Sequence, residues 1–486
     1  MAANTNIIQT PLHINTPVPV GQPLMFVVEN NQTVMNQTKV KFIAEVYIGT
    51  GFINTTLPDD LIGTFKTTPN AAGKGMFDFS NLVDSYVKVD QLASSGGSEF
   101  KEIPSNETSN RHPLHLVDKF SLNNNCLRYM LIVFSVEALD TTLTPPAVAL
   151  VDGSEKKSTL YSIFNGYLKS TDQLFNTALS NGFGYDMTRF VLGATDRKFL
   201  TNAPTTQYAN LDDYGTVAML SKPQYNVNFN RMRLDYYNSD GVLLDEEVVT
   251  RIISNGAFTN YSHKSKDDIL YFGCYPANLR NWSDIFKGLV TAGTINCGRI
   301  DVTANENITK ISSTYSIHIN APSGRGYESI RLTWLNQWGV WDYYTFTKKS
   351  TKTISTKGTT YEQLGGTWNE LRYFPDGFSG GKKAFRVNAT EKIKMNTDFV
   401  TENDTVMFEE LTNSPEVYIL GTFNADDVDN LVLNTYVTPA RITTSSFTRK
   451  TVANDKLMQY TFEVEKSKTL RTQSVGGGGG GNSGAA

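Results

Sequence analysis

Alternation of apolar and polar side chains is the strongest signal along this chain, and it predicts β-strands. Every second residue from Val40 to Ile48 is apolar. This period of two is typical of a strand with one buried face. A run at 127–136 is apolar enough to be buried on both faces. Other segments with strand-like composition lie at 24–28, 269–274, 383–394, 416–420 and 458–465.

Two hairpins are expected in the second half of the chain. Asp240-Gly241 lies within a strand-like run at 223–250, and Asp-Gly is a preferred two-residue turn between antiparallel strands. The second hairpin spans 330–346, with its turn at 336–339. Both patterns favour antiparallel pairing of neighbouring strands.

Helix signals are few and short. Ser80, Thr171 and Thr401 are residue types that cap helices, and each precedes apolar residues at helical spacing. The third helix is the clearest and should be the longest, because Thr401 and Asp404 form a variant of the capping box and Pro415 ends the helix. We expect helix in less than about a fifth of the residues.

Short connections and the lack of long helices argue against a parallel α/β fold. We expect an all-β protein made of several immunoglobulin- or fibronectin-like β-sandwich domains in tandem, with one short amphipathic helix near the C-terminus. The predicted organisation is an extended N-terminal arm at 1–20, a β-sandwich domain at 21–152, a loop-rich connector at 153–220, β domains at 221–304 and 305–394, a helix plus strands that close the C-terminal domain at 395–470, and a flexible glycine-rich tail at 471–486.

The two ends lack the periodicity of core segments. Residues 1–20 are rich in Pro, Asn and Thr, and the tail holds six consecutive glycines, which lose the most entropy on ordering. We therefore expect both ends to lie against neighbouring subunits. Removal of residues 1–20 should then weaken assembly and leave the fold intact.

Charge and composition narrow the possible partners. The net charge is −4 and charged residues make up 19% of the 486 residues, so nothing attracts the chain as a whole to nucleic acid or to an anionic membrane. We expect no direct nucleic-acid binding and no membrane span, since no apolar run is long enough. The N-terminus lacks the pattern of a secretory signal, and three scattered cysteines do not form a disulfide framework. Synthesis in a reducing cytoplasm is the simplest interpretation.

Catalytic and metal-binding motifs are weak. There is no GxSxG, P-loop or HExxH pattern. His112 and His115 lie three residues apart around a proline in a loop-like segment, and the acidic run at 424–430 lacks the glycine and distal glutamate of an EF-hand. We therefore expect no catalytic residue, no metal site and no cofactor.

Three of the five tryptophans lie within eight residues. Trp334, Trp338 and Trp341 could stack on sugars, but such a cluster more often belongs to a sheet core or a subunit contact. Together with Tyr343 and Tyr344 they are the candidate interface residues of the sequence.

Four segments resemble large β-rich virion proteins of tailed bacteriophages, especially environmental phages and phages of Bacteroidota. They are the N-terminal unit QPLMFVVENN…VKFIAEVYIG…GTFKTTPNAAGKGMFDFSNLVDSYV, then YFGCYPANLRNW (271–282), IRLTWLNQWGVWDYYTF (330–346) and MNTDFVTENDTVMFEELTNSPEVYIL (395–420). The resemblance implies a structural component of the tail or baseplate, present in the virion after synthesis in the host cytoplasm. It implies no catalytic residues.

The expected function is therefore non-enzymatic assembly, as a homo-oligomer and with other virion proteins as partners. Three alternatives stay open: a receptor-binding or fibre-base protein that docks a host surface glycan, a head decoration protein, and a tail polysaccharide depolymerase. The sequence does not separate head from tail.

Overall fold

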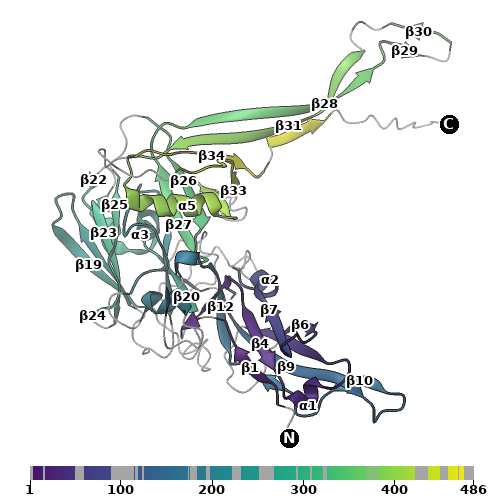
Figure 1. Ribbon diagram of the computed structural model, residues 1–486. Coiled ribbons are helices and arrows are strands. Elements are labelled where there is room, and N and C mark those ends of the chain that lie inside the picture. The colour runs from purple at the N-terminus through teal and green to yellow at the C-terminus, as the bar shows by residue number, and fades with distance from the viewer. Residues whose placement is uncertain are drawn as a thin grey trace, which may run out of the picture. The chain divides into compact units, whose positions relative to one another are not determined.

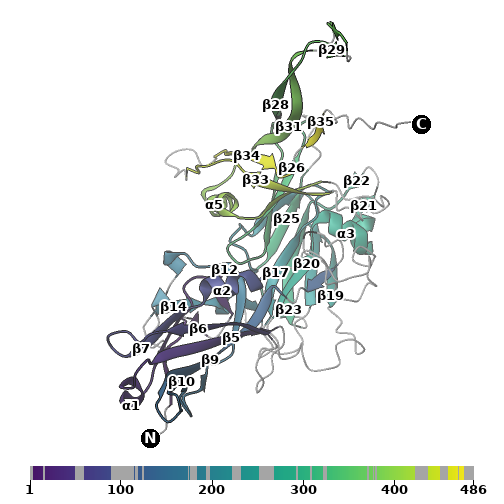
Figure 2. The same cartoon turned by 90° about the vertical axis from the view of Figure 1, so that its right-hand side faces the viewer.

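A computed structural model describes most of the chain, and strands dominate it (Figures 1 and 2). The all-β, multi-sheet fold class is thus confirmed, while the immunoglobulin-like character of the sandwiches stays a prediction. The described residues are 4–11, 13–14, 17–49, 60–88, 114, 119–122, 125–172, 174–175, 183–192, 197–221, 231–250, 268–291, 294–306, 309–320, 326–368, 371–375, 377, 380–421, 436–448, 458–468 and 470–474.

The chain divides into two compact units, and each is discontinuous in sequence. The first unit comprises Met1–Pro322, Leu335–Tyr343 and Thr422–Asn434, and the second comprises Ser323–Trp334, Tyr344–Gly421 and Thr435–Ala486. The turn of the 330–346 hairpin therefore belongs to the first unit, although most of its two strands belong to the second.

The first unit begins with a β-sandwich. One sheet holds β1 (Asn6–Gln9), β4 (Met25–Glu29) and β7 (Lys74–Asp78); the other has the order β3 (Val18–Gly21), β12 (Tyr161–Tyr167), β9 (Leu127–Asp140), β5 (Lys41–Gly49), β6 (Asp60–Thr67), with β10 (Ala147–Leu150) and β11 (Lys156–Lys157) also on β9. Aromatic rings join the two sheets: the centroids of Phe26 and Phe134 are 5.7 Å apart, and those of Phe77 and Phe134 also 5.7 Å. The predicted strands at 24–28, 40–48 and 127–136 are confirmed.

The expectation of an extended N-terminal arm is wrong. Residues 6–9 pair with β4, and β3 pairs in parallel with β12 through Ile163↔Val18 and Phe164↔Pro19. Val18 and Val20 are fully buried. A short strand that is buried on both sides carries no alternation, which is why the sequence pattern did not reveal it.

A second set of sheets completes the first unit. The larger has the order β16 (Thr206–Ala209), β25 (Tyr315–Ile319), β23 (Arg299–Glu306), β18 (Arg231–Tyr237), β19 (Leu243–Thr250), with β24 (Thr309–Lys310) on β23. Its inner face packs near α4 (Asp284–Leu289), where the rings of Tyr236 and Phe286 lie 5.7 Å apart. The smaller elements of the unit are a sheet of β15 (Val191–Leu192), β17 (Thr216–Ser221), β20 (Asp268–Gly273) and β8 (Phe120–Leu122), a sheet of β13 (Leu174–Phe175), β14 (Phe183–Asp186) and β2 (His13–Ile14), the pair β21 (Val290–Thr291) and β22 (Thr294–Ile295), and the helices α1 (Gln32–Met35), α2 (Ser80–Val83), η1 (Asp84–Tyr86), η3 (Ser170–Asp172), η4 (Met187–Phe190) and α3 (Pro276–Trp282).

The second unit is built on one eight-stranded sheet. Its order is β27 (Trp341–Phe346), β26 (Ile330–Leu335), β32 (Val417–Leu420), β33 (Val437–Ile442), β34 (Thr461–Lys466), β31 (Gly381–Asn396), β28 (Thr351–Gln363), with β35 (Leu470–Ser474) also on β31; β29 (Thr367–Trp368) pairs β30 (Tyr373–Phe374). Helix α5 (Thr405–Asn413) packs on it through Phe408, whose ring lies 5.0 Å from Tyr344 and 5.3 Å from Phe462.

The helix predictions have mixed outcomes. The capping box of Thr401 and Asp404 is present, and α5 behind it is the longest helix among the described residues. A helix begins at Ser80, but its cap is Phe79, and the Ser80 N–H donates to Asp78 instead. The helix expected after Thr171 is wrong where it is described, because residues 174–175 form β13 and pair with β14; this non-local pairing overrides the local helical spacing.

The predicted domain boundaries are also wrong. Strand β8 at 120–122 pairs with β20, and β16 at 206–209 pairs with β25, so sheets cross the boundaries expected at 152, 220 and 304. The expected connector at 153–220 supplies strands to several sheets. Local composition does not report such distant pairings.

Candidate functional site

The aromatic cluster singled out in the sequence is part of the core. Trp334 and Trp338 are completely buried, Trp341 and Tyr343 are almost so, and Tyr344 is half-buried against the α5 ring of Phe408. Side chains buried within their own chain do not offer a surface to another subunit or to a sugar. The prediction of an interface is therefore wrong for Trp334, Trp338, Trp341 and Tyr343, which belong to the core. For the half-buried Tyr344 it stays a prediction.

Polar contacts hold the tryptophan-bearing turn within the first unit. The indole N–H of Trp338 donates to Asn202 Oδ1 (3.2 Å), and Asn202 Nδ2 donates to Gln337 Oε1 (2.9 Å). Gln337 Nε2 donates to Asp172 Oδ2 (2.6 Å), and Asn336 Nδ2 donates to the Leu200 carbonyl (3.0 Å). Side-chain hydrogen bonds of Asn336, Gln337 and Trp338 thus hold the turn inside the first unit.

Asp342 is the acidic residue of this turn, and its pKa is shifted. It is buried, and the hydroxyl of Thr201 donates to its Oδ1 at 2.7 Å. Burial raises the pKa of Asp342 to about 6, against the opposing effect of hydrogen bonds from Thr201 and Asn336. Among the described residues it belongs to no group of three or more His, Cys, Asp or Glu that could hold a metal ion. Its hydrogen bond to Thr201 is a contact within the core.

The longest exposed element is a β-ribbon in the second unit, which we call the β-arm (residues 351–396). Strands β28 and β31 pair antiparallel from Thr351↔Lys394 to Gln363↔Gly381, and in Figures 1 and 2 they extend beyond the other strands of their sheet. Nearly every side chain of β28 is exposed. Within the described part of the chain, no strand pairs with the outer edge of β28.

Apolar groups on the β-arm are exposed to an unusual degree. Leu371 is 90% exposed and Leu364 80%, and both lie at the far end near β29 and β30. Ile354 is 61% exposed and Phe385 51%. An isolated two-stranded ribbon is at best marginally stable in water, and a long unpaired edge is a template for pairing with another strand.

The β-arm is also charged oppositely to the rest of the chain. Between residues 351 and 396 there are eight Lys and Arg but four Asp and Glu, whereas the full chain has 44 basic and 48 acidic residues. The arm therefore carries a net +4, and the remainder carries a net −8. Charges of opposite sign on two copies would attract each other.

A second exposed surface lies in the first unit, on the solvent-facing side of the β16–β25–β23–β18–β19 sheet. Register places four planar side chains next to one another across four strands: Tyr208↔His318, His318↔Arg299 and Arg299↔Tyr237. We call these four residues the planar row. The Tyr208 and His318 ring centroids are 5.4 Å apart, and Arg299 Cζ lies 4.1 Å from the Tyr237 centroid.

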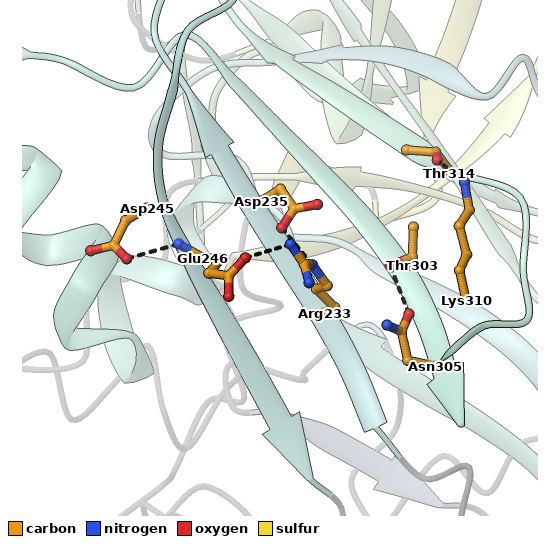
Figure 3. A network of polar contacts seen from close by, with 8 residues as sticks. All are labelled: Arg233, Asp235, Asp245, Glu246, Thr303, Asn305, Lys310 and Thr314. Atoms are coloured by element: carbon orange, nitrogen blue, oxygen red, sulfur yellow. Dashed lines mark hydrogen bonds and ion pairs between the residues drawn. The ribbon is translucent and has the colours of Figure 1, made fainter. Parts of the chain in front are cut away.

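A row of hydrogen-bonding groups runs beside the planar row. Ser316, Asp301, Asp235 and Glu246 occupy neighbouring positions on β25, β23, β18 and β19; we call them the carboxylate row. Figure 3 shows Arg233 between two of them: its Nε donates to Asp235 Oδ1 (2.7 Å) and its Nη2 to Glu246 Oε2 (2.5 Å). These pairs offset the repulsion that like charges on adjacent strands would cause.

The remaining candidates contribute no site. His112, His115 and the acidic run at 424–430 lie outside the described residues. Over the part that is described, no group of three or more His, Cys, Asp or Glu is placed to hold a metal, and no helix is long and apolar enough to cross a membrane. The three cysteines are buried thiols.

Comparisons with known proteins give little. No family model and no curated protein matches the chain. Among solved structures, a similar one is the native conformation of E. coli alpha-2-macroglobulin, determined by cryo-EM, with 9% identity and a TM-score of 0.17. The match covers 81% of this chain and 22% of that one, so this chain spans about a fifth of its length. A TM-score of this size carries no argument about fold or function.

Sequence reasoning missed both exposed surfaces. The β-arm sequence TKTISTKGTTYEQ is rich in Thr and has no apolar face, which is typical of a strand exposed on both sides. The planar row gave no local signal, because its four residues come from four strands and meet only through strand pairing.

Proposed function

We propose that this protein is a non-enzymatic structural component of a tailed-phage virion, in the tail or baseplate, which works by protein–protein assembly. The resemblance of four segments to such virion proteins motivates the proposal, and the all-β architecture is compatible with it. The observation that carries the assembly role is the β-arm, with its exposed edge and exposed apolar side chains.

The partner of the β-arm, on this proposal, is a second copy of the chain. The arm is basic and the remainder is acidic, so the two surfaces that one copy offers to the next are complementary in charge. Strand addition to β28 would satisfy the N–H and C=O groups of its outer edge. Such a contact joins different surfaces of two copies, and therefore builds a ring or a filament.

Deletion of the distal arm tests the assembly role. Gly358 and Val387 are directly paired, so replacement of residues 359–386 by Asn-Gly joins them through a two-residue turn. We expect the shortened chain to keep the melting temperature of the full chain, since the removed side chains are mostly exposed. Its mass by light scattering should fall to that of the monomer while the full chain forms oligomers.

A double charge variant and a control separate the effect of the arm's charge from the effect of removing the arm. K357E/R386E inverts two charges on one face of the arm, because Arg386 pairs with Thr359 and Lys357 lies two positions before Thr359 on the same strand. K198E, on an exposed lysine of the first unit, is the matched control. Oligomers that survive both the deletion and the double variant would refute the arm as the assembly surface.

The virion role has its own test. Peptides of this chain should be found by mass spectrometry in density-purified phage particles, at a copy number that is a multiple of the symmetry of the tail. Purified particles without the chain would refute the virion role and leave the oligomerisation result unaffected.

A further inference from the structure

Strand β19 (Leu243–Thr250) is an open sheet edge of the first unit. It ends the strand order β16-β25-β23-β18-β19, and no other strand of the described residues pairs with its outer side. Six of its eight side chains are exposed, among them Leu243 (48%) and Val248 (51%), and Val242 before the strand is 59% exposed. An open edge with exposed apolar side chains is a template for pairing with a further strand.

Charge distinguishes this edge from the other sheet ends of the first unit. β19 carries Asp245, Glu246 and Glu247 and no basic residue, so its net charge is −3. β16, at the opposite end of the same sheet, has no charged residue. The end strands of the unit's other sheets of three or more strands each have a net charge of zero with histidine neutral: β1, β7, β3, β6, β13, β2, β15 and β8. A basic strand is therefore attracted more strongly to β19 than to these edges.

The distal half of the β-arm matches β19 in length and in charge. Thr356–Gln363 of β28 has eight residues, as β19 has, and it pairs with residues 381–389 of β31. The charged residues of this part of the ribbon are Lys357, Lys382, Lys383, Arg386 and Glu362. Four basic residues and one acidic residue give it a net charge of +3, against −3 on β19. Two open edges of equal length and opposite charge are complementary.

We propose that Thr356–Gln363 of one copy adds as an antiparallel strand to the outer edge of β19 in a second copy. The inference rests on the proposed assembly role of the β-arm and names the surface that receives it. Main-chain N–H and C=O groups along the two open edges then bond to each other. The apolar ends of the strands set the direction, because antiparallel addition brings Leu364, 80% exposed just after β28, beside Val242, just before β19.

This alignment also places opposite charges on one face of the joined sheet. With the eight residues of each strand in register, Thr359 lies between its own partner Arg386 and Glu247 of the second copy. Lys357 and Asp245 lie on the same face, because each is two positions from a residue of this row. Opposite charges on neighbouring strands stabilise their pairing, and like charges there destabilise it.

Charge variants of β19 in the full chain test the contact. D245K inverts one acid and leaves the ion pair of Glu246 with Arg233 in place, whereas D245K/E246K inverts two acids. We expect the dissociation constant of the oligomer, measured by sedimentation velocity, to rise about tenfold for D245K and further for the double variant. D152K/E155K makes the same change in charge at two exposed acids between β10 and β11 and should leave the constant unchanged.

A mixture of two variants makes the result specific. D245K/E246K keeps the native arm and K357E/R386E keeps the native β19, so the mixture contains one pair of unchanged surfaces. Each variant alone should be monomeric, and the mixture should associate. Equal melting temperatures show that the variants fold. If D245K/E246K assembles like the wild type while K357E/R386E does not, the assignment of β19 is wrong and the arm keeps its proposed role; if both assemble, that role fails as well.

Cross-linking locates the contact directly. A photoreactive benzophenone amino acid in place of Thr359 is introduced into a chain labelled with heavy nitrogen, which is mixed with unlabelled wild type. Mass spectrometry should find the cross-link on the unlabelled peptide that contains residues 243–250. Cross-links to unlabelled residues 351–363 mean that two arms pair with each other, and cross-links confined to the labelled chain mean that no second copy is bound. Either outcome overturns the inference.

Discussion

At the scale of single residues, Trp338 is held by two side chains of the first unit: its indole N–H donates to Asn202 Oδ1, and the ring of Phe190 lies 4.6 Å from its own, centroid to centroid. Packing was one of the two interpretations of the cluster of Trp334, Trp338 and Trp341, but its spacing in the sequence does not identify these partners of Trp338. Those partners lie more than a hundred positions away in the sequence. A local pattern identifies which side chains need a partner, and only the fold says which partner they obtain.

Gly339 illustrates a constraint of this kind. It has φ +68°, and a Cβ at this position would lie 1.8 Å from the carbonyl oxygen of Asn165. Gly339→Ala should therefore lower the free energy of unfolding by more than about 3 kcal/mol, since backbone strain and a clash with another backbone add. Gly241→Ala is the control: its φ is +81° but its Cβ meets open space, so about 1–2 kcal/mol is expected. Equal losses in chemical denaturation would contradict the clash.

Asp342 makes the stability depend on pH. Its folded pKa of about 6 lies above the usual value near 3.8, so the folded state binds the proton more tightly. The contribution of this group to stability is present at low pH and is lost as pH rises from about 4 to 6. Asp342→Asn should remove that slope and stabilise the protein at pH 7.5 by up to about 3 kcal/mol. A variant that keeps the wild-type slope in denaturation curves between pH 4 and 7 would contradict this assignment.

At the scale of elements, antiparallel neighbours with clear periodicity were predictable, and elements fixed by distant pairing were not. The Asp240-Gly241 hairpin and the capped helix α5 are present because turn and cap chemistry is local. Strands β3 and β13 escaped prediction because they are short and depend on β12 and β14. Since residues near the N-terminus form strands of the first unit, changes there should lower the stability of the fold.

Substitution of Val18 and Val20 measures how much the N-terminal strand β3 contributes to stability. Both are fully buried in β3, so V18A/V20A should lower the free energy of unfolding by about 2–4 kcal/mol through lost burial and cavities. Ile8→Ala, on the partly exposed strand β1, should cost much less. If the double variant unfolds at the same denaturant concentration as the wild type, β3 does not belong to the folded core. Such a result would support the expectation of an extended arm at residues 1–20.

At the scale of the whole molecule, the sequence predicted an all-β protein of more than one unit, but not the path of the chain between units. Both units are discontinuous, and the 335–343 turn belongs to the first although its strands lie mostly in the second. Composition reports strand content, whereas the division into units depends on which distant segments pair. The uneven distribution of charge between the arm and the remainder, by contrast, is a property of the sequence itself.

This charge distribution predicts how assembly responds to salt. If the basic β-arm of one copy meets the acidic surface of another, added NaCl should weaken the contact, because the screening length falls from about 10 Å at 0.1 M to about 3 Å at 1 M. The oligomer measured by analytical ultracentrifugation should therefore dissociate between these concentrations. In K357Q/R386Q, which removes two arm charges, the dissociation constant should depend less steeply on salt. Apolar contact through Leu364, Leu371 and Ile354 alone would behave in the opposite way, since exclusion of salt from apolar surfaces strengthens their burial. If the oligomer instead becomes more stable with added salt, the arm can still be the interface, but charge complementarity is not the reason that it binds a second copy.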